Sequence, residues 1–227
     1  MISLFLVLSQ KIIKRFVLIL ILIAAIPGIS VPLYASIVLK GFPVKPINVT
    51  KPSLLLTDVH GKHGVPDIAV VFYSEDKKHT TLKWGEIGTS DELIEEDSAG
   101  QHIFIMEDLK PAAEYKYQIN NGTEYYFTAP PIDGSIHFAV ASDAHFGAEK
   151  SRPDLTEQML NIIAYPSNNY EAFFFVGDMV EFGFSDVQWN EALNIMTKST
   201  LTIPAVYTAG NHDTLFGGFE RCLKYLT

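Results

Sequence analysis

Cysteine is almost absent from this chain of 227 residues, in which Cys222 is the only one. A disulfide within the chain is therefore excluded, and with it the class of small secreted folds that depend on disulfides. We interpret Cys222 as a small buried apolar residue rather than as a reactive thiol. Pairing with a cysteine in further sequence is the alternative.

Basic clusters and serine-hydrolase motifs are lacking as well. The chain has 17 Lys and Arg against 26 Asp and Glu, which gives a net charge of −9. After residue 40, no stretch gathers Lys and Arg into the footprint that a nucleic-acid-binding surface needs. No G-x-S-x-G motif occurs, and Cys222 lies outside the context of a cysteine nucleophile. These absences argue against nucleic-acid binding and against a serine or cysteine hydrolase.

Acidic residues are missing from the first forty positions. Lys11, Lys14 and Arg15 precede an uncharged, mostly apolar run at residues 16–39, which predicts a hydrophobic helix long enough to cross a bilayer. Residues 1–40 are therefore a signal anchor or a signal peptide, and the poor cleavage site before Ser36 favours the anchor. Both alternatives place the remainder outside the cytoplasm, membrane-anchored or secreted, and an uncleaved segment would make the membrane a partner.

Residues 41–52 are predicted to be an extended linker, and residues 53–131 a β-sandwich. Short runs of alternating apolar and polar residues occur in the second segment, at residues 68–73, 80–84, 103–106, 115–119 and 125–128. Turn-rich segments such as 74–78 and 95–100 separate the runs. This period of two is typical of antiparallel strands in a sandwich, with Trp84 expected in the core.

A tyrosine corner is predicted within this sandwich. Leu109-Lys110-Pro111 is followed by Tyr115, the arrangement in which a phenol oxygen bonds back to the backbone at a turn between two late strands. We therefore predict a fibronectin type III-like domain at residues 53–131.

Three apolar runs in residues 132–227 each end in potential metal ligands. The runs lie at residues 136–147, 173–183 and 203–213, and each has the β-branched and aromatic composition of a buried strand. Helical patterns follow the first two runs, with Pro153 in one first turn and the capping pair Ser185 and Gln188 before the other. The order β-α-β-α-β predicts a parallel sheet whose strand ends open on one edge, where ligands bind.

The residues at these strand ends suit divalent metals. Asp143, His145, Asp178, Asn211 and His212 would meet in one cleft. Carboxylate, imidazole and amide groups are ligands that Zn, Mn or Fe accept, and one carboxylate can bridge two ions.

The motif set D-x-H, G-D-x-x-x-x-G and G-N-H-D resembles the calcineurin-like metallophosphoesterases. It occurs here as Asp143-Ala144-His145, Gly177-Asp178 to Gly183, and Gly210 to Asp213. The resemblance implies an α/β sandwich, of which this chain has the first βαβαβ part. It also implies hydrolysis of phosphate esters by a hydroxide that two divalent or mixed-valence metal ions activate. Whether these ions are Zn, Mn or Fe is left open.

The same resemblance implies a role for each site residue. Asp143 and His145 would bind the first metal ion, Asp178 would bridge both ions, and Asn211 would bind the second. His212 would stabilise or protonate the reacting phosphate ester, and Asp213 would orient its ring. A sandwich domain ahead of such a site also resembles the arrangement of the purple acid phosphatases.

Two departures from the family pattern affect what this chain is expected to do. Glu181 stands where the purple acid phosphatases carry a metal-binding Tyr, which argues against an iron–tyrosinate centre. The family's later histidines, an isolated His and a G-H-x-H motif, have no counterpart after His212. We therefore expect an N-terminal fragment of a phosphoesterase that is inactive by itself and leaves one sheet face uncovered. The alternative is a non-catalytic extracytoplasmic binding protein with a remnant phosphoesterase domain.

Overall fold

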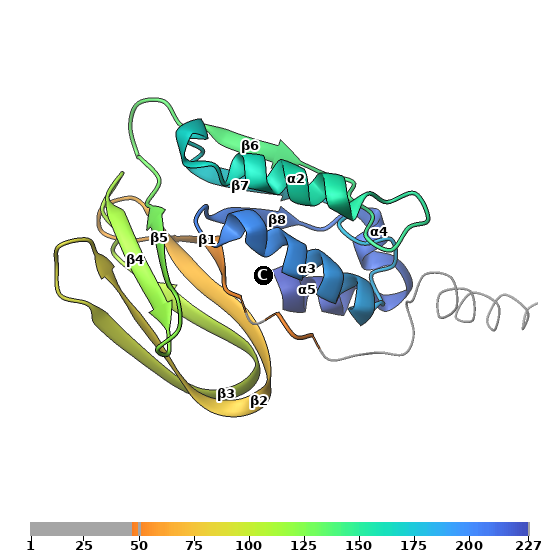
Figure 1. Ribbon diagram of the computed structural model, residues 1–227, viewed down its shortest axis with the longest axis horizontal. Coiled ribbons are helices and arrows are strands. Elements are labelled where there is room, and N and C mark those ends of the chain that lie inside the picture. The colour runs from red at the N-terminus through yellow and green to blue at the C-terminus, as the bar shows by residue number, and fades with distance from the viewer. Residues whose placement is uncertain (1–46, 50, 227) are drawn as a thin grey trace, which may run out of the picture.

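The computed structural model describes residues 47–49 and 51–226 (Figure 1). The segment predicted to be a signal anchor or signal peptide, and most of the predicted linker, lie outside these residues. Among the helices of the described part, none is both long and apolar enough to cross a membrane.

A β-rich region precedes an α/β region. The first contains β1 (Ser53–His60), β2 (Pro66–Glu86), β3 (Glu92–Met106), β4 (Glu114–Ile119) and β5 (Glu124–Thr128). The second contains β6 (Phe138–Ala141), α2 (Pro153–Ile163), η1 (Pro166–Asn168), β7 (Ala172–Val176), α3 (Asp186–Thr200), β8 (Ala205–Thr208), α4 (Asn211–Thr214), η2 (Leu215–Gly217) and α5 (Phe219–Leu226). All strands join one sheet in the order β5-β4-β2-β1-β8-β7-β6, with β3 paired to β2.

Strands β2 and β3 are longer than the sequence predicts. The prediction of turns at residues 74–78 and 95–100 is wrong, because both strands run through these positions. A shift of register between Ser74 and Lys78 marks an irregularity in the ladder. Before it β2 pairs with β1, and after it β2 pairs with β4. One bent hairpin therefore supplies what the sequence suggested as separate strands.

The β-rich region has its own core, built from both halves of the bent hairpin. Trp84 is buried there, as predicted, and its ring lies 6.1 Å from that of Tyr115. The predicted tyrosine corner is present, since the Lys110 amide donates to the Tyr115 hydroxyl oxygen at 2.8 Å. The remaining buried members of this first core come from all five strands and the adjoining turns.

Strands β1 and β2 contribute to a second core as well. Leu54, Val70 and Phe72 point into the first core, whereas their neighbours Leu55 and Val71 belong to a cluster shared with the α/β region. Because side chains alternate along a strand, the two faces of this part of the sheet are both buried. The β-rich and α/β regions are thus packed on either side of the same strands.

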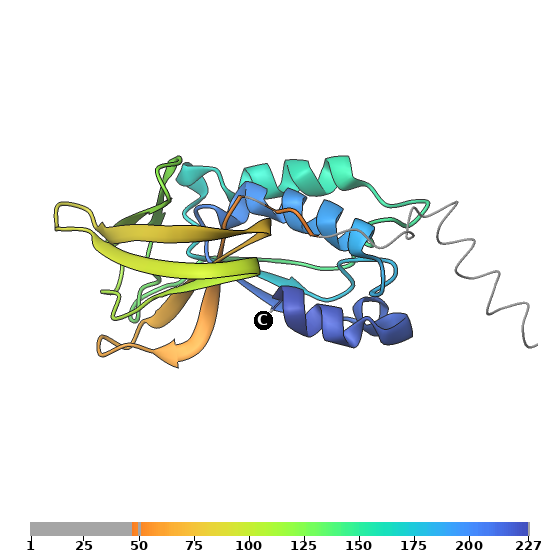
Figure 2. The ribbon, with the colours of Figure 1, turned by 90° about the horizontal axis from the view of Figure 1, so that it is seen from below.

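The α/β region is the predicted parallel β-α-β-α-β unit. Strands β6, β7 and β8 pair in parallel, and β8 also pairs in parallel with β1 through Leu55 and Ala205. Helices α2 and α3 lie side by side over one face, as both views show (Figure 2). Ser185 caps α3 by accepting from the Gln188 amide, as predicted.

The opposite face of this sheet is open to solvent at β6 and β7. Phe138 and Val140 of β6 and Val176 of β7 are each about half exposed, at 51%, 57% and 48%. Their neighbours Phe173 and Phe175 point the other way and are buried beneath the helices. The predicted uncovered face is therefore present in the described part of the chain.

Helix α5 is joined to the rest by a buried acidic group. Asp186, at the start of α3, accepts from Arg221 Nε at 2.7 Å and from the Tyr225 hydroxyl at 3.1 Å. Cys222 lies on the buried side of α5, as predicted, and burial raises the pKa of its thiol to about 12. The thiol is consequently protonated and unreactive at neutral pH.

Candidate metal centre

The segments after β6 and β7 remain paired beyond the ends of the strands. The Asp143 amide donates to the Gly177 carbonyl at 3.1 Å, and the His145 amide donates to the Asp178 carbonyl at 3.1 Å. A further parallel bridge joins Phe146 to Val180. These bonds hold the D-x-H and G-D motifs against each other, so the ligands predicted from them come from neighbouring backbones.

The three predicted ligands on these segments share a strained backbone. Asp143, His145 and Asp178 have φ angles of 59°, 44° and 54°. Side chains rarely adopt this left-handed region, although Asp and His tolerate it better than most residues. Such strain typically costs about 1–3 kcal/mol per residue and is found at functional sites, where the surrounding structure maintains it.

Asp178 is held by the G-N-H-D segment that follows β8. The His212 amide donates to Asp178 Oδ1 at 2.8 Å. Gly210 permits this approach, because a Cβ at that position would lie 2.2 Å from Asp178 Oδ1 and 2.3 Å from the Asp178 nitrogen. All three motifs therefore meet around one carboxylate, as the sequence predicts.

The resulting side chains fit a divalent ion. One ligand atom each from Asp143, His145 and Asp178 lies within 4.8 Å of the other two. A second group with the same spacing comprises His145, Glu181 and His212. The two sets share His145 and combine carboxylate oxygens with imidazole nitrogens, the mixed donors that Zn, Mn and Fe accept.

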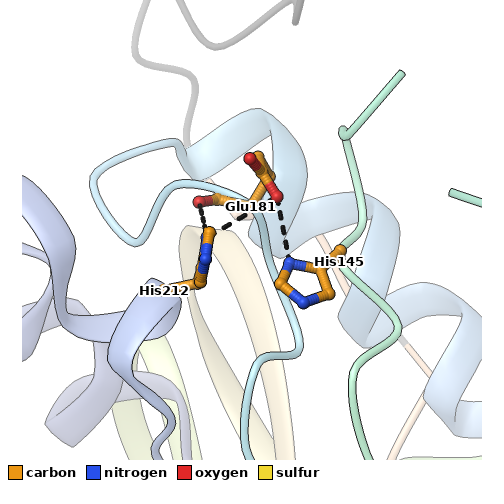
Figure 3. Close-up of side chains that lie close together, drawn as sticks. All are labelled: His145, Glu181 and His212. Carbon is orange, nitrogen blue, oxygen red and sulfur yellow. Dashed lines mark hydrogen bonds and ion pairs between the residues drawn. The ribbon is translucent and has the colours of Figure 1, made fainter. Parts of the chain in front are cut away.

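Glu181 lies between the two histidines (Figure 3). Its carboxylate oxygen Oε2 is 3.0 Å from His145 Nδ1 and 3.5 Å from His212 Nδ1. Its backbone carbonyl is 3.0 Å from His212 Nδ1. The imidazole rings meet edge to face, with centroids 4.5 Å apart. The sequence identified Glu181 only as the residue that stands in place of a Tyr. Its position three residues after Asp178 was the signal that could have placed it near the site.

These contacts determine which ring nitrogens carry protons. A carbonyl oxygen only accepts hydrogen bonds, so His212 Nδ1 must donate to Glu181, which leaves His212 Nε2 to give or take a proton. The Glu181 carboxylate likewise accepts from His145 Nδ1 and leaves His145 Nε2, which is 3.7 Å from Asp143 Oδ1, available as a ligand atom.

Asp213 makes different contacts from those implied by the family resemblance. Its fully buried carboxylate accepts from the Val180 amide and the Gly210 amide, each at 2.9 Å. It therefore ties the loop after β7 to the start of α4. The described contacts of the His212 ring lead to Glu181, so orientation of this ring by Asp213 stays a prediction without a contact to support it.

Asn211 occupies the first turn of α4 and is exposed beside His212. Its backbone carbonyl accepts from the Thr214 hydroxyl at 3.0 Å. The role of its side-chain amide as a metal ligand stays a prediction.

Comparison with known proteins identifies a family for the region that contains the site. Residues 136–226 match the family model of the calcineurin-like phosphoesterases. Among solved structures, the chain is similar to the purple acid phosphatase PPD1 from seeds of yellow lupin, Lupinus luteus, with 20% identity and a TM-score of 0.55. It is also similar to PhoD, with 14% identity and a TM-score of 0.50. No curated protein sequence gave a significant match.

These two structural matches establish similarity of fold over most of the chain. Each covers 74% of this chain, but the chain spans 36% of the length of the lupin structure and 40% of the length of the PhoD structure.

Proposed function

Residues 136–226 belong to the calcineurin-like phosphoesterase family, and on that premise we propose that the centre around Asp178 serves the metal-dependent hydrolysis of phosphate esters. The observation that carries the proposal is that the three motif segments meet at Asp178. The three predicted ligands on the first two segments, Asp143, His145 and Asp178, also have a strained backbone.

Asp143, His145 and Asp178 would hold one ion, and Asp178 with Asn211 would contribute to a second. Divalent ions bound there would neutralise charge on the phosphate and acidify a water molecule. The chain's own groups have separate tasks. Glu181 fixes the ring of His145 so that its Nε2 faces the carboxylate of Asp143.

His212 is proposed as the acid–base group. Its Nδ1–H donates to the Glu181 carbonyl, so the imidazolium form, which is protonated at Nε2 as well, can donate a hydrogen bond to the phosphate and give up the Nε2 proton to the departing alkoxide. Glu181, close to both histidines, is proposed to help orient His212. Asp213 acts indirectly by fixing the two loops that carry Asp178 and His212.

The remaining assignments are proposals of the same kind. We propose that residues 53–131 form a fibronectin type III-like accessory domain, supported by the strand pairing and by the tyrosine corner. Export of the chain, with residues 1–40 as anchor or signal peptide, is supported by the apolar run and its preceding basic residues.

Calorimetric titration with Mn²⁺ or Zn²⁺ tests the metal centre. We expect the chain to bind at least one ion and Asp178→Asn to weaken that binding at least tenfold, because the charge of a carboxylate shared by the proposed ligand sets is lost. Asp58→Asn, which removes an exposed carboxylate of β1, is the matched control. Equal metal affinity in the wild type and Asp178→Asn would contradict the proposed centre.

Hydrolysis of 4-nitrophenyl phosphate tests His212. We expect His212→Ala to lower whatever metal-dependent turnover the protein shows about 100-fold, the usual contribution of an acid–base group, while metal affinity changes little. Metal-dependent binding of phenylphosphonate, an unreactive analogue, is measured in parallel. If the chain binds metal but not the phosphonate, the non-catalytic binding protein becomes the better account.

A further inference from the structure

A cavity of about 530 Å³ opens directly beside the metal centre. Asp143, His145 and Glu181 line one side of it. Lys150, Ser151 and Arg152, in the segment that leads into α2, line another part of the wall. Its size falls within the range of pockets that bind small molecules. Because nothing in the proposed hydrolysis uses this second wall, its chemistry bears on which ester the site accepts.

Two successive turns bring the second wall back toward the D-x-H motif. The Ala148 amide donates to the His145 carbonyl at 2.9 Å. The Ser151 amide and hydroxyl then both donate to the Ala148 carbonyl, at 3.2 Å and 2.9 Å. The segment is thus folded by its own hydrogen bonds, and the position of Lys150 relative to His145 is defined by the backbone.

Lys150 is the cation of this wall that remains available. Arg152 donates from Nε and Nη2 to the two carboxylate oxygens of Asp154, at 2.9 Å and 2.6 Å, which occupies its charge. Among the residues whose side chains the structure describes, no carboxylate forms an ion pair with Lys150. The positive end of the α2 helix dipole lies next to it and favours an anion in the same place.

Most of the remaining lining of the cavity is apolar, and Ser142 and Thr156 are its polar members. Leu155 and Met159 of α2 lie opposite Phe175 of β7, and Ala141 and Ala148 complete this surface. Leu155 is 48% exposed and lines this cavity. A hydrocarbon chain or an aromatic ring of a bound ligand would cover this apolar surface.

We propose that the cavity receives the alcohol part of the phosphate ester, and that Lys150 selects esters whose alcohol combines an apolar body with a second anionic group. This inference rests on the phosphoesterase function proposed above. The phosphate would occupy the metal end of the cavity, the body would contact Leu155 and Met159, and the second anion would meet the Lys150 ammonium group.

Two unreactive analogues that differ by one charge test the proposal. Phenylphosphonate and 4-phosphonobenzoate share the phosphonate and the aromatic body, and only the second carries a carboxylate. Their affinities are measured by calorimetry for the wild-type chain with saturating Mn²⁺. We expect 4-phosphonobenzoate to bind about fivefold more tightly, the size expected for one partly exposed ion pair, and the preference to decrease as salt is added.

Substitutions test whether Lys150 causes the preference for 4-phosphonobenzoate over phenylphosphonate. Lys150→Ala should abolish the preference and leave the affinity for phenylphosphonate within about twofold of the wild type, as should Lys150→Gln. Lys51→Ala removes an exposed lysine outside the cavity and should retain the preference. Leu155→Ala should lower the affinity for both analogues by a similar factor, because it removes a contact with the aromatic ring that they share.

The outcomes separate this inference from the function on which it rests. Equal binding of the two analogues by the wild type, or an undiminished preference in Lys150→Ala, overturns the role of Lys150 while the phosphoesterase site stands. Binding of neither analogue by a chain that demonstrably holds Mn²⁺ overturns the proposed function itself, and the inference with it.

Discussion

At the residue scale, the glycines of the motifs determine whether the site can assemble. Gly210→Ala is expected to displace Asp178, because the added Cβ would overlap its Oδ1 and backbone nitrogen at 2.2 and 2.3 Å. We expect unfolding to become easier by about 1–3 kcal/mol, as for other overpacked positions, and metal affinity to fall at least tenfold.

Chemical denaturation and metal titration measure these two effects. Gly122→Ala is the comparison, since a Cβ there would approach only the Ile119 carbonyl oxygen, at 3.1 Å. A Gly210→Ala protein with unaltered metal affinity would show that Asp178 moves without cost and that the close approach is not required.

Residue identity predicted which candidate ligands lie together better than it predicted the contacts that support them. The sequence placed Asp143, His145 and Asp178 together because each follows a strand of one parallel sheet. It did not predict that Glu181 would contact both histidines. It also did not predict that the carboxylate of Asp213, in the first turn of α4, would accept from the Val180 and Gly210 amides. Such local competition for hydrogen-bond donors is not visible in a motif.

At the scale of elements, α5 depends on the acidic group at the start of α3. Arg221→Leu is expected to lower the free energy of unfolding by about 3 kcal/mol, because Asp186 is 5% exposed and would lose its cationic partner in a buried position. Thermal unfolding measures the loss.

The double variant Arg221→Leu/Asp186→Asn provides the control. Removing both charges should restore much of the stability, because no unpaired buried carboxylate remains. If Arg221→Leu alone is as stable as the wild type, the ion pair does not hold α5 in place.

Helices were predicted more accurately than strands for a physical reason. The capping pair at Ser185 and the Pro at position 153 are local signals, and both helices start at or directly after these residues. The length of β2 depends on its pairing with β3, which tolerates a shifted register between Ser74 and Lys78. A polar segment that composition assigns to a turn can therefore continue a strand when a partner supplies the hydrogen bonds.

At the scale of the whole molecule, the shared strands predict that the two regions unfold together. Each core contains one of the two tryptophans, Trp84 in the β-rich core and Trp189 in the core shared with the α/β region. We expect the single-tryptophan variants Trp84→Phe and Trp189→Phe to give urea transitions that coincide with the loss of circular dichroism measured on the same protein.

Within each variant, fluorescence and dichroism are compared directly, so a change of stability caused by the substitution itself does not affect the result. Fluorescence of Trp189 that is lost well before the dichroism of the sheet would show that the α/β region unfolds by itself and that the shared faces contribute little to cooperativity.

The strands that serve both cores also impose an order of events during synthesis. The core around Trp84 draws its buried residues from positions 54 to 129 and can close as soon as these have been made. The opposite face is covered later in synthesis. Leu55 pairs with Ala205, and the Tyr73 hydroxyl donates to the backbone carbonyls of Lys224 and Tyr225. Residues 129 and 225 are 96 positions apart, so at translation rates of 5–20 residues per second part of that apolar face remains bare for roughly 5–19 s. A nascent chain with this architecture therefore exposes one apolar side of its β-rich region until α5 has been made.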